Sequence, residues 1–420
     1  MGTPPLPDPS PRRLPGLSPI LFQIHWFIGI TAGMVLMVVG VTGALLSYQD
    51  EILRALNPGV LSVAARPEPA LPPAELIRRI EAASGGRVAS LTLAAAPDRP
   101  ARAFLTPREA PPPGTRPRRE LRLADPRDGS LLGTPVGEGF FRTTRELHRW
   151  LLAGAEGRIV VGVSTIALVV LSLTGLYLRW PRRVLSWRAW FRIDPKLRGR
   201  ALLWRLHAVI GTWVLPLYVL AGLTGLFWSF DWYRNALFDL TGAPRPNAEA
   251  GPPRGEGAQG QGEARARGEG RAVRPAVDLD AAWTVFLRER PDYATAQLRL
   301  PNPGQPLRIT YVEAEAAHED ARSSVAINAA GEVVEHRRYA EQPLGHRLMG
   351  SILALHSGSY FGPLGTALMM VASLVMPLFG ITGWILYLGR RRMKAARAAA
   401  GGRRPRPAGE APAPPEGSRA

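Results

Sequence analysis

The sequence of 420 residues contains no cysteine. This absence excludes disulfide bonds, thiolate metal sites, cysteine-bound iron–sulfur clusters and haem attached covalently through a C-x-x-C-H motif. Any metal or cofactor that the protein binds must therefore use other ligands, of which histidine is the most versatile. The chain has only seven histidines, so each of them can be considered individually.

Acidic residues are also scarce: 34 Asp and Glu stand against 52 Lys and Arg, which gives a formal net charge of +18. A strongly basic chain can bind nucleic acid. Here the cations adjoin long apolar segments, as is typical of the flanks of membrane spans, so we expect the lipid bilayer as a partner and no nucleic acid. Arg12 and Arg13 precede an apolar segment that is too long for a cleaved signal peptide, and we interpret them as a topological anchor.

Four apolar segments have no charged residue in their central parts, and each exceeds the roughly 20 residues that cross a bilayer as a helix. They cover residues 21–48, 158–180, 203–230 and 360–388. The connection 181–202 and the C-terminal flank 389–420 are rich in arginine, so we expect both in the cytoplasm. Four spans then place the N-terminal tail 1–20 in the cytoplasm and the long connections 49–157 and 231–359 outside it.

Each long connection has the pattern of a small α+β unit. The first contains a predicted helix, "PPAELIRRIEAA", with apolar Leu76, Ile77 and Ile80, followed by the predicted strands "RVASLTLAA", "ARAFLTP" and "RELRLADPRDGSLLG". The second repeats this order with "DLDAAWTVFLRE", "ATAQLRLP", "QPLRITYVEA" and "SSVAINAAGEVVEHRRY". Residues 242–276 are of low complexity and predicted to be a flexible tether, and we expect the tail 389–420 to be disordered.

An internal repeat organises the spans. The first span aligns with the third, and the second with the fourth, without gaps. The matched residues are His25 and His207, Gly29 and Gly211, Thr42 and Thr224, and Gly43 and Gly225 in the first alignment, and His148 and His356, Thr174 and Thr382, and Gly175 and Gly383 in the second. We interpret the chain as a tandem duplication of span, outer unit and span, with a Thr-Gly pair in every span and one histidine matched to each.

The duplication pairs the histidines by membrane face. His25 and His207 begin outward-running spans and are expected near the cytoplasmic face, whereas His148 and His356 precede inward-running spans and are expected near the outer face. One unbroken helix from His148 to Thr174 would be longer than the hydrocarbon core, so we expect breaks at "AGAEG" and "GSYFGPLG". Haem iron takes axial imidazoles and a helix bundle can hold the macrocycle, so two bis-histidine haem sites are the favoured interpretation.

Other residues extend this interpretation. Gly29 and Gly211 lie one turn after a histidine, where small residues would leave room for a porphyrin. Arg149, Arg205 and also Arg347 are candidate partners of the haem propionates. The simpler alternatives stay open at this point: a lone histidine at a membrane boundary is usually an interfacial or hydrogen-bonding residue, and Thr-Gly pairs more often serve helix packing.

Three histidines fall outside the repeat. His346 lies ten residues before His356 and is an additional candidate for a ligand or a substrate contact. His318 and His336 stand in predicted strand or loop segments and are expected to be ordinary surface residues.

The spans also resemble a known family. The segments "LHRWLLAGAEGRIVVGVSTIALVVLSLTGLYLRWPRR", "LLWRLHAVIGTWVLPLYVLAGLTGLFWSF" and "LHSGSYFGPLGTALMMVASLVMPLFGITGWILYLGRR" closely resemble the helix signature of the PepSY-associated transmembrane family. The resemblance extends to about residue 395. It implies a membrane α-helical fold with four transmembrane helices and two external α+β PepSY-like domains, located in the bacterial inner membrane with both termini in the cytoplasm.

The resemblance also implies an activity. Some members of the family are thought to be haem-containing ferrisiderophore reductases, which implies two b-type haems per chain on His25, His148, His207 and His356, and a ferric siderophore or other ferric chelate as the partner. The electrons would come from quinol or a cytoplasmic reductase, and the sequence does not identify the catalytic residues. The alternative is a non-catalytic PepSY scaffold, a regulator of peptidases or a transport accessory protein.

Overall fold

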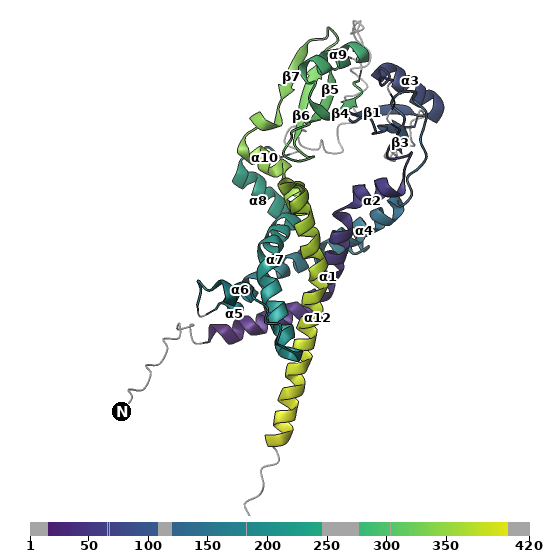
Figure 1. Cartoon of the computed structure of the whole chain (residues 1–420). Helices are drawn as coiled ribbons and strands as arrows, with labels where there is room; N and C mark the ends of the chain where they lie inside the picture. Colours follow the sequence, from purple (N-terminus) through teal and green to yellow (C-terminus); the bar gives the residue numbers. More distant parts are fainter. Residues whose placement is uncertain are drawn as a thin grey trace, which may run out of the picture. The chain divides into compact units, whose positions relative to one another are not determined.

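The computed structural model describes residues 16–64, 66, 68–107, 120–181, 183–245, 277–302 and 304–401. Four helices in this part of the chain are long and apolar enough to cross a membrane (Figure 1). They are α1 (Leu17–Leu46), α5 (Gly154–Arg179), α7 (Gly199–Ser229) and α12 (Gly362–Gly401). The prediction of a membrane protein with four apolar helices is confirmed. Most of the predicted tether, from residue 246 to 276, lies outside the described residues.

The chain divides into two compact units, and the boundary between them crosses the four long helices. The first unit comprises Met1–Met37, Val170–Leu215 and Met376–Ala420, and the second comprises Val38–Val169 and Pro216–Val375. The first unit therefore contains one end of each long helix. The second contains the other ends together with all of the described strands.

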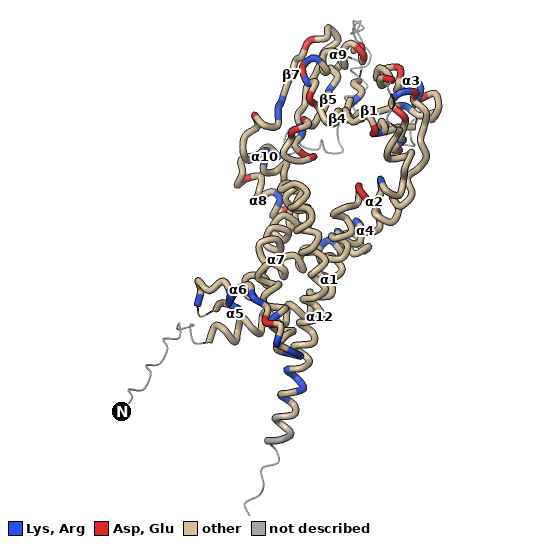
Figure 2. The backbone as a smooth tube through the Cα atoms, in the orientation of Figure 1, with Lys and Arg blue, Asp and Glu red and all other residues tan. Residues whose placement is uncertain are grey.

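The last helix is longer than the sequence suggests. α12 continues past residue 388 to Gly401, so the segment 389–401 is helical, where a disordered tail was expected. The reason is local: between Arg390 and Ala400 the chain consists only of Arg, Lys, Met and Ala, which are strong helix formers. Figure 2 shows the cations of this segment, in contrast to the uncharged central parts of the long helices. Residues 402–420 lie outside the described part.

A helix break precedes both α5 and α12, although the break predicted at "AGAEG" (153–157) lies slightly earlier, at 151–153, and α5 begins within that motif. α4 (Glu138–Trp150) is separated from α5 by three residues, and Leu151 and Leu152 have positive φ values of 49° and 58°, a conformation that cannot continue a right-handed helix. α11 (Ile352–Ser357) ends at Gly358, where φ is 84°, and the short η3 (Ser359–Phe361) leads into α12. His148 and His356 therefore lie on short helices that precede the long ones.

The two predicted outer units form one structure. Their strands make a single antiparallel sheet with the order β3-β2-β1-β4-β5-β6-β7, in which β1 and β4 pair at the junction of the two halves. The strands are β1 (Arg87–Ala94), β2 (Ala101–Thr106), β3 (Glu120–Ala124), β4 (Tyr293–Arg299), β5 (Leu307–Glu313), β6 (Arg322–Ile327) and β7 (Val333–Arg337). Where the sequence suggests two units, the structure thus has one sheet domain to which both contribute.

One face of the sheet carries the core of this domain. α3 (Pro73–Ser84) and α9 (Leu279–Glu289) pack on it, and Leu76 and Phe286 from these helices share a fully buried cluster with Leu91 and Leu298 of the paired central strands. Alternate strand residues point to this face, as the burial of every second residue in β2 and β5 shows. The remaining helices of the described ranges are short: α2 (Gln49–Leu56), α6 (Trp187–Phe191), α8 (Asp231–Thr241), η2 (Tyr339–Glu341) and α10 (Leu344–Gly350).

Candidate functional site

The first pair of histidines lies in the first unit, where the ring centroids of His25 on α1 and His207 on α7 are 6.4 Å apart. Nδ1 of His25 is 2.9 Å from Oγ1 of Thr174 on α5. Nδ1 of His207 is 2.7 Å from Oγ1 of Thr382 on α12. Each of the four long helices therefore contributes one polar residue to this site.

The second pair lies in the second unit and repeats the arrangement. The ring centroids of His148 on α4 and His356 on α11 are 6.3 Å apart. Nδ1 of His148 is 3.1 Å from Oγ1 of Thr42 on α1, and Nδ1 of His356 is 3.0 Å from Oγ1 of Thr224 on α7. The structure thus brings together the two histidine pairs that the internal repeat predicts, and adds a threonine to each ring.

The threonines determine which nitrogen of each imidazole carries the proton. A threonine hydroxyl has one proton, and each of these four donates it to a backbone carbonyl one turn earlier. The acceptors, at 2.6–2.7 Å, are Val38 for Thr42, Val170 for Thr174, Leu220 for Thr224 and Leu378 for Thr382. Each Oγ1 must therefore accept its second hydrogen bond from a histidine Nδ1–H. The lone pair of each neutral imidazole is then on Nε2, and no hydrogen bond of the described residues uses any of the four Nε2 atoms.

The two rings of the second pair lie outside the four apolar helices that could span a membrane. Burial lowers the pKa of His148 below its ordinary value of 6.5. Burial, with a smaller contribution from the neighbouring His148, lowers the pKa of His356 to about 4. Both imidazoles are therefore neutral at pH 7, which is the form that binds a metal.

The glycine after each threonine leaves space for a histidine ring. A Cβ atom added to Gly43 would lie 3.1 Å from Cε1 of His148, and the corresponding distance from Gly175 to Cε1 of His25 is 3.2 Å. Gly225 repeats this at 3.3 Å from His356, whereas a Cβ on Gly383 would meet no atom within 4 Å. Three of the four Thr-Gly pairs therefore seat an imidazole, because the hydroxyl binds Nδ1 and the glycine accommodates the adjacent Cε1. The sequence argument favoured helix packing for these pairs, although their number, one per span, matches the number of paired histidines.

The geometry of both pairs fits a haem. Two imidazole nitrogens that each lie about 2.0 Å from a metal ion between them place the ring centroids about 6 Å apart, close to the observed separations. Two imidazoles alone are too few ligands for a stable protein-bound metal, and the described residues contain no group of three or more His, Asp or Glu that could hold one. A tetrapyrrole would supply the ligands that are missing, and the two histidines of each pair would hold its iron.

The glycines predicted to border a porphyrin contact side chains. A Cβ on Gly29 would lie 3.8 Å from Cδ2 of Leu171, and a Cβ on Gly211 would lie 3.5 Å from Cε1 of Phe379. These are ordinary van der Waals distances. Neither glycine therefore faces open space in this structure.

The arginines proposed as propionate partners have contacts of their own. Arg205 donates to the backbone carbonyls of Arg188 and Arg192 at the end of α6. The guanidinium carbon of Arg149 lies 4.6 Å from the centroid of the Trp150 ring. The guanidinium of Arg205 thus stabilises α6. The guanidinium of Arg149 contacts an aromatic ring, and it could bind an anion in place of that contact.

The three remaining histidines differ from one another. His346 is half-buried on α10 and makes no hydrogen bond with another described residue. His336 is exposed, as predicted, and its Nε2 lies 2.8 Å from Oη of Tyr311. The prediction that His318 is a surface residue is wrong, because only 6% of it is exposed. The error arises because the burial of this loop residue depends on the distant segment 339–351, which no local pattern reveals.

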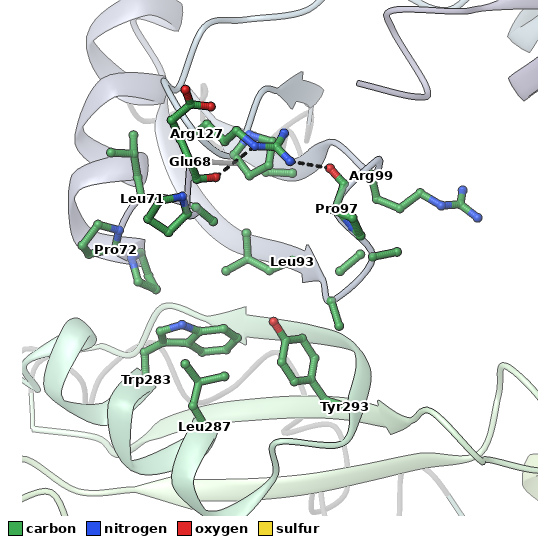
Figure 3. A pocket seen from close by; sticks show the side chains of 18 of the residues that line it. Glu68, Leu71, Pro72, Leu93, Pro97, Arg99, Arg127, Trp283, Leu287 and Tyr293 are labelled. Atoms are coloured by element: carbon green, nitrogen blue, oxygen red, sulfur yellow. Dashed lines mark hydrogen bonds between the residues drawn. The ribbon is translucent and has the colours of Figure 1, made fainter. Parts of the chain in front are cut away.

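The sheet domain also contains a cleft of about 570 Å³ between the start of α3, the end of β1 and α9 (Figure 3). The rings of Trp283 and Tyr293 face Leu93 across it. Arg127 lines the side of the cleft opposite Trp283 and Tyr293, where it donates to the carbonyls of Glu68 and Pro97. The lining contains no histidine, so this cleft is not part of either histidine pair.

Two comparisons with known proteins bear on the site. The sequence profile of the family described as "PepSY-associated TM region" matches residues 22–390, which include all seven histidines. Over 163 residues the chain is 30% identical to "Uncharacterized protein PA4219" of Pseudomonas aeruginosa, a match that covers 38% of each protein. The matched region is therefore well under half the length of that relative.

Proposed function

The chain belongs to the PepSY-associated transmembrane family, and we propose that it is a two-haem electron-transfer protein of the bacterial inner membrane that reduces ferric siderophores or other ferric chelates. One observation carries the proposal: in each pair two imidazoles are held through Nδ1, and their Nε2 atoms make no hydrogen bond with the residues that the structure describes. Imidazoles that are oriented through one ring nitrogen and free to coordinate through the other are what a haem iron would need. The haem supplies one-electron chemistry when it is bound.

The residues of each site have separate tasks. His25 and His207 would hold one b-type haem, and His148 and His356 the other. The threonines fix the tautomer and the orientation of the rings, and Gly43, Gly175 and Gly225 leave space for three of them. Arg149 is available for a propionate. None of these residues needs to move a proton during electron transfer.

The charge distribution supports an orientation in the membrane. Lys and Arg outnumber Asp and Glu in the segment around α6 and in the last part of α12 (Figure 2), and cationic flanks favour the cytoplasm. The His25–His207 pair is then on the cytoplasmic side and the sheet domain in the periplasm, with both termini cytoplasmic. Electrons would enter from quinol or a cytoplasmic reductase and leave from the His148–His356 pair. The substrate class follows from coordination chemistry, because hard oxygen ligands hold Fe(III) more strongly than Fe(II), so gain of one electron loosens the chelate.

An absorption spectrum tests the proposal directly. Protein purified from haem-replete cells should show a Soret band, and dithionite should produce the α band of a low-spin b-type haem. Mixing the reduced protein with ferric chelates under argon should reoxidise the haem, so that the α band disappears while an Fe(II) indicator dye develops colour. A colourless protein would overturn the proposal and leave the non-catalytic scaffold as the better explanation.

A glycine pair offers a finer test of the second site. Alanine at Gly43 must displace the His148 ring by a few tenths of an ångström, so we expect Gly43→Ala to lower the affinity for one haem about tenfold, a typical effect at a residue that orients a ligand. Gly383→Ala is the matched control, since it changes the same motif where no atom lies within 4 Å. Haem content after prolonged dialysis measures the difference. Equal losses in the two variants would contradict the seating role of Gly43.

A further inference from the structure

A buried polar cluster lies outside both histidine pairs, where the loop between β5 and β6 meets the junction of α10 and α11. Nε2 of His318 is 3.0 Å from Oη of Tyr339 and 3.0 Å from Oγ of Ser351. The two hydroxyl oxygens are 2.7 Å apart, and both lie within 3.0 Å of the carbonyl of Arg347. Ser351 Oγ–H can donate to this carbonyl while its oxygen accepts from Tyr339 Oη–H, and a proton on Nε2 of His318 can be shared between the two hydroxyl oxygens.

The other nitrogen of His318 is not satisfied. Its Nδ1 is buried and has no hydrogen-bond partner among the described residues. The ring packs against Tyr339 and Tyr360, with centroids 5.5 and 5.6 Å away. Burial lowers the pKa of His318 and so favours the neutral ring, while the nearby Asp320 has a smaller, opposite effect. A buried nitrogen without a hydrogen bond lowers the free energy of unfolding, so an apolar residue at this position would destabilise the fold less. The presence of a histidine is therefore best explained by the hydrogen bonds of its Nε2 with Tyr339 and Ser351.

Ser351 connects two short helices. Its backbone N–H bonds the carbonyls of Arg347 and Leu348 in α10, and its own carbonyl accepts from Leu355 in α11. α11 has only six residues and carries His356, so its direction depends on this junction. In the first half of the chain His148 lies instead near the end of α4, an unbroken helix of 13 residues. Of these two histidines, only His356 therefore lies on a helix that needs contacts with other segments to fix its direction.

We propose that His318 is a positioning residue for His356. Through Ser351 and Tyr339 it fixes the helix that presents this ligand, and it thereby ties a loop of the sheet domain to the axial coordination of one haem. The effect on the haem rests on the proposed function, whereas the effect on α11 does not. A change in the sheet domain, such as binding of a chelate, would reach His356 along this connection.

Hydrogen–deuterium exchange on the full-length protein in lipid nanodiscs tests whether His318 stabilises α11. His318→Ala should reduce the protection of amides in 344–357 at least tenfold, and Ser351→Ala should do the same. His336→Ala is the control, because it removes the other hydrogen-bonded histidine of the sheet domain at an exposed position. Unchanged protection of 344–357 in His318→Ala would overturn the proposal, and this readout does not depend on haem.

A redox titration tests the effect on coordination. In a His25→Ala background only the His148–His356 haem should remain, and adding His318→Ala should shift its midpoint potential and its low-spin electron paramagnetic resonance signal. His318→Gln, which keeps a hydrogen-bonding side chain, should restore much of the signal. In a His148→Ala background the same His318 change should leave the remaining haem unaltered. Shifts of both haems, or of neither, would contradict a positioning role, whereas absence of haem from the parent protein would refute the proposed function and leave the exchange result to decide on His318.

Discussion

Replacing His25 by alanine is expected to lower the haem content of the purified protein from about two to about one per chain, because the haem proposed for this site would lose one of its two protein ligands and should dissociate during purification. His207→Ala should give the same result, since the two rings share one site with centroids 6.4 Å apart. His148→Ala and His356→Ala should each remove the other haem. A haemochromogen assay with a protein determination measures the stoichiometry, and electron paramagnetic resonance shows which low-spin signal disappears.

The variants also test the pairing itself. The two members of a pair must remove the same spectral component, and members of different pairs must remove different ones. His336→Ala serves as the control, because His336 is exposed and should leave both haems in place. If any single replacement removed both haems, or if His25→Ala and His148→Ala removed the same one, the two pairs would not be independent sites.

The sequence predicts much of this architecture because hydropathy and helical periodicity act locally. Four uninterrupted apolar segments identify the long helices, and the pattern of Leu76, Ile77 and Ile80 identifies the buried face of α3. The breaks before α5 and α12 follow from a length argument, since one helix from His148 to Thr174 would be too long for the bilayer. The pairing of the histidines follows from the repeat, which relates positions far apart in the chain.

Other features depend on contacts that no local pattern encodes. The pairing of β1 with β4, which joins the two predicted α+β units in one sheet, depends on the encounter of strands some 200 residues apart. The burial of His318 depends on Tyr339 and Ser351. The sequence does not reveal that the Thr-Gly pairs hold imidazole rings, because each threonine hydroxyl bonds a histidine from another helix, as Thr174 does with His25.

Replacing one of the threonines that bond a histidine is expected to have the second large effect on haem binding. Thr174→Val keeps the shape of the side chain but removes the oxygen that accepts from His25 Nδ1–H, so a buried donor loses its partner and the ring loses its orientation. Removal of a group that orients a metal ligand typically costs 10–100-fold in affinity, and we expect a loss in this range for the haem of the His25–His207 pair only. The rate of haem transfer to an excess of apo-globin measures it, with the His148–His356 haem as an internal reference.

Thr174→Ser separates the hydrogen bond from packing. Serine keeps the hydroxyl that bonds both Val170 O and His25 Nδ1, so it should retain haem nearly as well as the parent protein. Thr42→Val should reverse the pattern and release the other haem, but by a smaller factor, because His148 Nδ1 also lies 3.0 Å from the carbonyl of Val39 and keeps that acceptor. If valine and serine at position 174 behaved alike, the hydroxyl would not set the orientation of the ring. The alignment of Nε2 with an axial position would then have to come from packing against Gly175.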